Sequence, residues 1–87
     1  MKLAIKYYGT IREAARKREE TIEAREGVTL EQLFAILSQK YGAEYTKLLR
    51  SSYLRVFVNE RLFDEKDREQ RIDEGSTISF VLALHGG

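Results

Sequence analysis

The sequence predicts an α+β fold in which one main helix packs on one face of a mixed sheet of four to five strands. Two segments, residues 2–8 and 77–84, alternate polar and apolar side chains with the period of two that is typical of strands with one buried face. Residues 29–42 instead place apolar side chains at the 3.6-residue spacing of a helix. With shorter strand-like segments between them, the order is strand, strand, helix, strand, strand, strand, as expected for a helix laid across a sheet.

The N-terminal part of the chain predicts a hairpin. The strand at residues 2–8 and a second strand at residues 20–25 are expected to pair, and Glu26-Gly27 then turns the chain. Residues 11–18, between the two strands, contain apolar side chains spaced for a short helical turn. The side chains expected on the buried face of the two strands are Leu3, Ile5, Tyr7, Ile22 and Ala24.

The strongest helix signal begins at Thr29. Thr29 and Gln32 match a capping box, in which a hydroxyl and an amide side chain satisfy backbone N–H groups at the helix start. Gly42 stands where a left-handed glycine commonly ends a helix. Burial against a sheet explains the apolar stripe of this helix without a cofactor. The stripe consists of Leu30, Leu33, Phe34, Leu37 and Tyr41.

The second half of the chain predicts three more strands. The first of them spans residues 54–58, and Asn59-Glu60 can turn the chain into a short strand at residues 61–63. The last strand, residues 77–84, is expected to return beside the first strand of the chain. A connector between the helix and these strands contains Tyr45, Leu48 and Leu49.

A charged segment, residues 64–74, precedes the last strand, and Ile72 is its expected buried anchor. Its acidic side chains are of a type that binds metal ions, but basic residues alternate with them. We therefore interpret this segment as a solvated turn. The alternating residues are Asp64, Glu65, Lys66, Asp67 and Arg68.

A hairpin, a helix across one face and a last strand beside the first make the β-grasp, or ubiquitin-like, arrangement. We expect a single domain over residues 1–87, with residues 84–87 as a flexible Gly-Gly tail. The expected core consists of Leu3, Ile5, Ile22, Leu33, Phe34, Leu37, Val56, Val58, Ile78 and Phe80.

The charge and hydropathy of the chain argue against two classes of partner. Lys and Arg number 15 and Asp and Glu number 14, for a net charge of +1, without the basic excess that nucleic-acid-binding proteins show. No apolar run approaches the roughly 18–20 residues that span a bilayer, and the first residues do not form a signal-peptide core. We expect a cytoplasmic protein that binds neither nucleic acid nor membrane.

Catalysis by side chains is also unexpected. Without cysteine there is no thiolate nucleophile, thiolate zinc site or iron–sulfur cluster. The one histidine, His85, is near the end of the chain, which is a poor place to hold a catalytic base. The six glycines form no phosphate-binding loop. We therefore expect no metal, no cofactor and no enzyme activity of the chain by itself, with catalytic groups supplied by partners.

The most informative segment is Leu84-His85-Gly86-Gly87. Because glycine has no Cβ, the last two residues can enter a narrow channel and leave the terminal carbonyl group uncrowded. These properties suit a carboxylate that is itself the reacting group once another protein activates it, for example as an acyl-adenylate. The activated Gly87 could accept sulfur to become a thiocarboxylate, or accept an amine to become an amide. The absence of cysteine favours the first outcome.

Several segments resemble the MoaD family, the small subunit of molybdopterin synthase, which belongs with ThiS among the ubiquitin-like sulfur carriers. The similar segments cover nearly the whole chain in the family's order: residues 5–15, 27–33, 56–59, 74–76 and 86–87. The resemblance implies that a ubiquitin-activating-enzyme-like adenylyltransferase adenylates Gly87 and that a sulfurtransferase system supplies sulfur. The thiocarboxylate then enters the large synthase subunit, with Leu84, His85 and Gly86 in its channel, and donates sulfur to the molybdopterin precursor.

Two departures from the family pattern keep alternatives open. Leu82-Ala83 stands where the family commonly has Pro-Pro, and His85 replaces a small residue, so that residues 81–87 resemble the end of ubiquitin. A ubiquitin-like modifier conjugated to lysines through Gly87 is therefore an alternative, as is a sulfur carrier for tRNA thiolation or thiamine. A third hypothesis is a β-grasp interaction module whose tail has no role.

Strand alternation predicts a second functional surface. If Val56 and Val58 face the helix, Phe57 points to the open face of the sheet. An exposed apolar patch with a basic rim suits the docking of an activating enzyme or a large subunit, although a loop over Phe57 would be an alternative. The expected patch consists of Tyr8, Arg55, Phe57, Val81 and Ala83, with Lys6 as a neighbour.

Overall fold

A computed structural model describes residues 1–82 of the chain. The strands and helices follow the predicted order, with one helix more than expected. They are β1 (Lys2–Gly9), α1 (Thr10–Ala15), β2 (Glu19–Glu23), α2 (Leu30–Tyr41), α3 (Ala43–Leu49), β3 (Arg55–Val58), β4 (Arg61–Phe63), the 3₁₀ turn η1 (Glu65–Asp67) and β5 (Thr77–Leu82).

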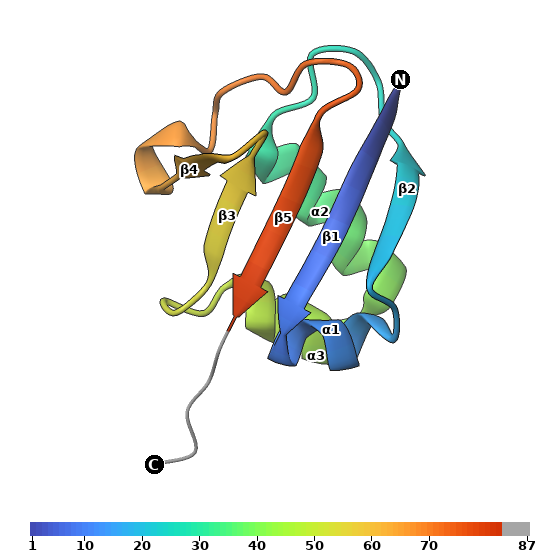
Figure 1. Cartoon of the computed structure of the whole chain (residues 1–87), viewed down its shortest axis with the longest axis vertical. Coiled ribbons are helices and arrows are strands. Elements are labelled where there is room, and N and C mark those ends of the chain that lie inside the picture. The colour runs from blue at the N-terminus through green and yellow to red at the C-terminus, as the bar shows by residue number, and fades with distance from the viewer. Residues whose placement is uncertain (83–87) are drawn as a thin grey trace.

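The strands form one mixed sheet in the order β2-β1-β5-β3-β4 (Figure 1). The central pair, β1 and β5, is parallel, and the other neighbours are antiparallel. Parallel strands need a crossover connection, which here carries the chain through α2 over one face of the sheet. The predicted β-grasp fold, with the last strand beside the first, is confirmed.

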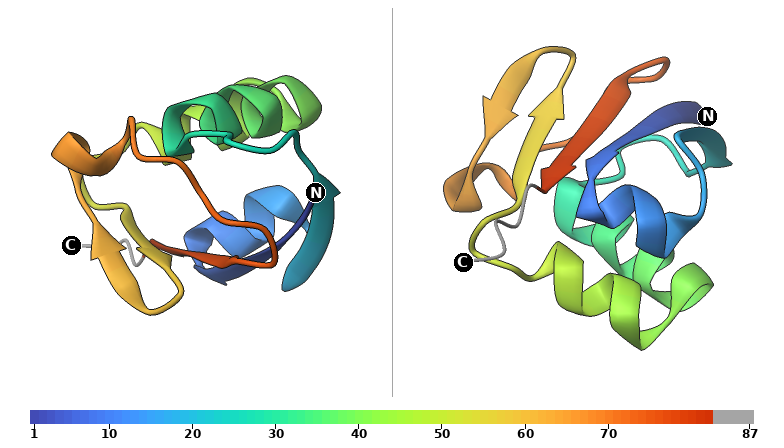
Figure 2. Two further views of the ribbon diagram at one scale, coloured as in Figure 1. Left: turned by 90° about the horizontal axis from the view of Figure 1, so that it is seen from above. Right: turned by 60° about the horizontal axis from the view of Figure 1, so that its bottom comes forward.

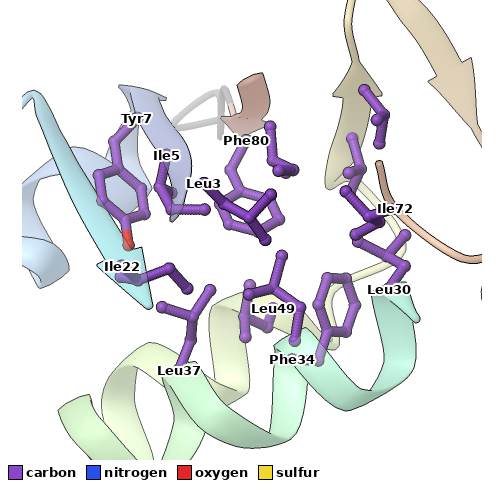
Figure 3. Close-up of a cluster of buried hydrophobic side chains, with 14 of the residues drawn as sticks. Leu3, Ile5, Tyr7, Ile22, Leu30, Phe34, Leu37, Leu49, Ile72 and Phe80 are labelled. Carbon is purple, nitrogen blue, oxygen red and sulfur yellow. The ribbon is translucent and has the colours of Figure 1, made fainter. Parts of the chain in front are cut away.

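The helices gather on one face of the sheet, and the core fills the space between them and the strands (Figure 2). Figure 3 shows this core, with Leu3, Ile5 and Phe80 of the sheet directed toward Phe34 and Leu37 of α2. All ten predicted core residues are buried. The core also includes side chains beyond that prediction, among them Tyr7, Ile11, Leu30, Tyr45, Leu49, Ile72 and Leu82.

Helix α2 begins with the predicted capping box. The Thr29 hydroxyl accepts a hydrogen bond from the Gln32 backbone N–H at 3.1 Å, and the Gln32 side chain accepts one from the Thr29 N–H at 3.0 Å. The predicted conformation of Gly42 is wrong. Its φ is +88°, but its ψ is −162°, outside the left-handed helical region, because the chain turns directly into another helix.

That helix, α3, occupies the segment interpreted as a connector. Tyr45 and Leu49 are four residues apart, so both lie on the face of α3 that packs on the core, and both are fully buried. The interpretation was wrong because α3 is short and begins without a side-chain cap.

The turn between β3 and β4 forms as predicted at Asn59 and Glu60, whose φ angles are +49° and +72°. Two positive φ angles are what a tight hairpin with right-handed strand twist requires. The Asn59 side chain also accepts a hydrogen bond from the Thr77 N–H at 2.9 Å and donates one to the Ser76 hydroxyl at 3.0 Å. This residue therefore ties the hairpin to the start of β5.

The charged segment after β4 is anchored by Ile72, as predicted, but it is not fully solvated. Asp67 is buried and accepts hydrogen bonds from the Asp64 backbone N–H at 3.0 Å and from the Gln70 side chain at 2.7 Å. These bonds close η1, so the role of Asp67 is to hold the turn. Within residues 1–82, no group of acidic or histidine side chains is arranged to hold a metal ion.

Candidate partner-binding face

The open face of the sheet, opposite the helices, presents the outward side chains of its three middle strands. Because β1, β5 and β3 are neighbours, their outward residues align in rows across the sheet. One row contains Lys6, Ser79 and Phe57, and the next contains Tyr8, Val81 and Arg55. The predicted residues Tyr8, Phe57 and Val81 are thus brought together from three segments distant in the sequence.

These side chains border a shallow open hollow of about 840 Å³ along β5. The small side chains Thr77 and Ser79 form its floor, whereas Tyr8 and Phe57, on the two flanking strands, are larger and form its sides. The complete lining is Lys6, Tyr8, Phe57, Asn59, Glu60, Thr77, Ser79 and Val81. A partner that projects a ridge can therefore contact all three central strands at once.

Exposure of large apolar side chains supports a binding role for this face. Tyr8 is 41% exposed and Leu62, the cross-strand neighbour of Phe57, is 49% exposed. Phe57 and Val81 are half-buried. A cluster of exposed apolar side chains with polar residues at its edge is typical of protein-binding sites. Lys6 and Glu60 are the charged residues of the hollow and can orient a partner electrostatically.

Arg55 lies in the predicted row but points away from the hollow. Its guanidinium group donates hydrogen bonds to the carbonyl oxygens of Ser52 and Leu54, both at 3.1 Å. The residue therefore borders a separate groove of about 450 Å³ beside the loop that leads into β3. It stands at the edge of the predicted patch, next to Val81.

The sequence prediction missed four residues of the hollow. Thr77 and Ser79 belong to the same outward alternation as Val81, so the signal for them was present in the sequence. Asn59 and Glu60 join the hollow because the hairpin turn folds beside β5. No pattern within the turn itself indicates that contact.

The remaining predicted site residues, Ala83, Leu84, His85, Gly86 and Gly87, lie outside the described residues. The structure does place the residue that precedes them. Leu82 ends β5 in the middle of the sheet, is fully buried and pairs with Gly9 of β1. The last described residue thus lies on the central strand of the sheet, beside the row of Tyr8, Val81 and Arg55. None of the helices described in residues 1–82 has the length and apolar content needed to cross a membrane.

A comparison with protein families matches residues 5–87 to the ThiS family. The chain belongs to the ThiS family. Its fold is that of the ubiquitin-like sulfur carriers and modifiers, as the resemblance to MoaD and ThiS proteins predicted. No curated protein matches the sequence of this ThiS-family chain.

Solved structures similar to this ThiS-family protein share its fold at low sequence identity. SAMP1 from Haloferax volcanii is 13% identical, with a TM-score of 0.82 and 100% of both chains covered. A putative molybdopterin converting factor subunit 1 from Pyrococcus furiosus is 18% identical, with a TM-score of 0.78, covering 97% of this chain and 99% of that one. The complex of subunits 1 and 2 of molybdopterin-converting factor from Helicobacter pylori contains a chain that is 23% identical, with a TM-score of 0.65 and 100% of both chains covered.

Proposed function

We propose that this protein is a sulfur carrier in molybdopterin biosynthesis, as the small subunit of molybdopterin synthase. Its Gly87 would be adenylated and converted to a thiocarboxylate that donates sulfur. The observation that carries the sulfur-carrier part of this proposal is the ThiS-family match, which includes Gly86 and Gly87.

The proposed chemistry acts on the main chain. A Gly87 carboxylate oxygen attacks the α-phosphate of ATP, pyrophosphate leaves, and an acyl-adenylate forms. Hydrosulfide, supplied as the sulfur nucleophile, then attacks the acyl carbon, so that a C–S bond forms, AMP departs and loss of the S–H proton gives the thiocarboxylate. A ubiquitin-activating-enzyme-like adenylyltransferase would supply the catalytic groups for adenylation. The large synthase subunit would receive the tail, with Leu84, His85 and Gly86 in its channel.

The geometry of the open face supports such partners. The hollow bordered by Tyr8, Phe57 and Val81 lies on the same strand that leads to the tail. A partner docked there, with Arg55 and Ala83 at the edge of the contact, would hold the start of the tail at a fixed place. The Helicobacter pylori neighbour is a complex of two subunits of a molybdopterin-converting factor, which favours a large subunit as one partner.

The direct test is the intact mass of the chain after incubation with an activating enzyme, ATP and a sulfur source. We expect the mass gain of one oxygen replaced by one sulfur, located at Gly87 by fragmentation. A chain lacking Gly87 is the matched control and should gain nothing. Adding the large subunit and the molybdopterin precursor should return the mass to its starting value. A chain that is adenylated but never acquires sulfur would contradict the proposal.

A second candidate function is protein modification through an amide between Gly87 and a lysine. It is favoured by the similarity to small archaeal modifier protein 1 (SAMP1) of Haloferax volcanii, of which a second solved structure matches at a TM-score of 0.75 and 11% identity. Its test is a search for Gly86-Gly87 remnants on lysines of other proteins in cells. Sulfur transfer to tRNA or to a thiamine precursor would appear in the first experiment as sulfur that leaves only when that acceptor is supplied.

A further inference from the structure

A buried carboxylate joins β2 to α2 and β1 on the helix side of the sheet. The Glu20 side chain is only 7% exposed. One of its oxygens accepts hydrogen bonds from the hydroxyl groups of Tyr7 at 2.8 Å and Tyr41 at 2.5 Å. Its other oxygen accepts one from the Lys40 ammonium group at 2.8 Å, with the Lys17 ammonium group 3.9 Å away. Every group that faces this carboxylate is therefore a donor.

The charge of Glu20 sets the direction of a hydrogen-bond chain that ends in α3. The Tyr7 and Tyr45 hydroxyl groups lie 2.8 Å apart. A tyrosine hydroxyl group has one proton, and Tyr7 gives its proton to Glu20. Tyr45 must then donate to Tyr7, so the chain runs from α3 through β1 to β2.

Protonation of Glu20 reverses this arrangement. A protonated carboxyl group has a hydrogen of its own to donate. The ammonium groups of Lys40 and Lys17 cannot accept it, because they are donors only. If the Tyr7 hydroxyl group accepts a hydrogen bond from the protonated carboxyl group, its own hydrogen can turn only to Tyr45, and the hydrogen of the Tyr45 hydroxyl group then needs another acceptor. Within residues 1–82 the structure shows no second partner for that hydroxyl group. A buried hydroxyl group without a partner destabilises the packing around it.

The segment that depends on this hydrogen-bond chain is the α2–α3 corner, defined here as residues 40–46. Gly42, which joins the two helices, is exposed, and α3 begins there without a side-chain cap. Tyr45 is the buried residue of this corner, and its ring stacks on Tyr41 at 4.6 Å between centroids. The far end of α3 is held separately, by Leu49 in the core and by an Arg50–Glu31 ion pair at 2.9 Å.

We propose that Glu20 is an acid-released latch: ionised, it fastens the α2–α3 corner to the sheet, and protonated, it lets the corner open while the sheet stays folded. The opened corner would expose the rings of Tyr41 and Tyr45. The groups that face Glu20 are Lys40 and Tyr41 of α2, Tyr7 of β1 and Lys17 of the loop before β2, with Tyr45 of α3 behind Tyr7.

The pH range of the release follows from the environment of Glu20. Burial raises the pKa of Glu20, but the hydrogen bonds from Lys40, Tyr41 and Tyr7 together lower it by more than burial raises it. The pKa of Glu20 therefore lies below the ordinary 4.5. A carboxyl group with a lowered folded-state pKa stabilises the fold above its unfolded-state pKa and loses that contribution as the pH falls through the folded-state value. The latch is therefore closed at neutral pH and opens below about pH 4.5.

The experiment is native-state hydrogen exchange on the full chain and on Glu20→Gln, which is neutral at every pH. The amides of Gly42 and Thr46 report on the corner, because they bond to the carbonyl groups of Ser38 and Gly42. The Ala4 amide, bonded to the Ser76 carbonyl group and outside the hydrogen-bond chain of Glu20, reports on the sheet. At neutral pH we expect Glu20→Gln to accelerate exchange at both places. The ratio of the variant rate to the wild-type rate should be about tenfold larger at the corner than in the sheet.

Two further variants make the result decisive. Glu19→Gln removes an exposed charge from the neighbouring position of β2 and should leave the corner unchanged. Tyr45→Phe removes the stranded hydroxyl group, so Glu20→Gln should accelerate exchange at the corner less in this background. Equal acceleration of the corner and the sheet by Glu20→Gln would overturn the proposal, since Glu20 would then stabilise the whole fold. Since the sulfur chemistry plays no part in this experiment, its failure would leave the proposed function untouched.

Discussion

The hydroxyl groups of Tyr7 and Tyr45 lie 2.8 Å apart in the interior of the protein, although 38 positions separate the two residues in the chain. Their rings meet edge to face at 5.9 Å, and the Tyr7 ring also stacks near Phe80 of the central strand. Tyr7, a residue of β1, thus connects the sheet to α3. The substitution that tests this relationship removes one oxygen atom.

Tyr7→Phe is expected to lower the free energy of unfolding by about 1–3 kcal/mol, because Glu20 loses a donor and Tyr45 loses its acceptor in a buried site. Denaturant unfolding at neutral pH measures the loss. Tyr8→Phe is the matched control, since Tyr8 is the next residue and is 41% exposed, and its effect should stay within about 0.5 kcal/mol. Equal stability of Tyr7→Phe and the wild type would show that the buried hydroxyl group contributes nothing.

Stability should decline in alkali because of the same tyrosine. Burial, and then the hydrogen bond with Tyr45, raise the pKa of Tyr7 far above its ordinary value of about 10. Because the pKa is higher in the folded state, the neutral hydroxyl group contributes to the free energy of unfolding. This contribution is complete below about pH 10 and is lost as the pH rises above that value toward the folded-state pKa. Melting temperatures between pH 8 and pH 11 should fall more steeply for the wild type than for Tyr7→Phe. Parallel curves for the two proteins would contradict this assignment.

The Asn59 side chain should matter for stability more than a turn position usually does. Asn59→Ala removes the hydrogen bonds to the Thr77 N–H and the Ser76 hydroxyl group and puts alanine at a φ of +49°. We expect a loss of about 1–2 kcal/mol in denaturant unfolding. Asn59→Gly also lacks the two hydrogen bonds, but glycine adopts the positive φ without strain. The difference in the free energy of unfolding between Asn59→Ala and Asn59→Gly therefore measures the backbone strain, and Asn59→Gly should be the more stable of the two.

The neighbouring position offers a stabilising substitution. Glu60 has a φ of +72°, which costs energy for any residue with a Cβ, whereas glycine adopts it freely and gives the Asn-Gly pair that tight hairpins prefer. Glu60→Gly should raise the free energy of unfolding by about 0.5–1 kcal/mol. Thermal unfolding checks the sign, with Glu69→Gly outside the turn as the comparison. A lower melting temperature for Glu60→Gly would mean that the Glu60 side chain makes a stabilising contact.

Phe57 provides the test of the open face. Phe57→Ala should weaken binding of an activating enzyme or large subunit by about tenfold or more, because half-exposed aromatic side chains in a hollow carry a large share of interface energy. Titration calorimetry measures the affinity. Ile36→Ala removes an apolar side chain of 40% exposure from α2, on the other face of the sheet, and should bind normally. Equal loss of affinity in both variants would place the interface elsewhere.

Local sequence patterns were sufficient for most of the fold. Alternation in residues 2–8 and 77–84 identified the two central strands, and Thr29 with Gln32 identified the start of α2. Such signals are local because side-chain direction in a strand and capping of a helix depend on residues only a few positions apart. The same alternation indicated Tyr8, Phe57 and Val81 as outward residues of the sheet.

Tertiary structure decided the features whose partners are distant in the sequence. Helix α3 is too short, at 7 residues and without a side-chain cap, to be recognised from its own sequence, and it is stabilised by burial of Tyr45 and Leu49 under the sheet. No sequence pattern indicates the surroundings of Glu20, because its three donors, Tyr7, Lys40 and Tyr41, come from β1 and α2. The hollow of the open face likewise exists only because β5 lies between β1 and β3. The sequence determines which way each side chain points from its own backbone, but what that side chain meets is set by long-range packing.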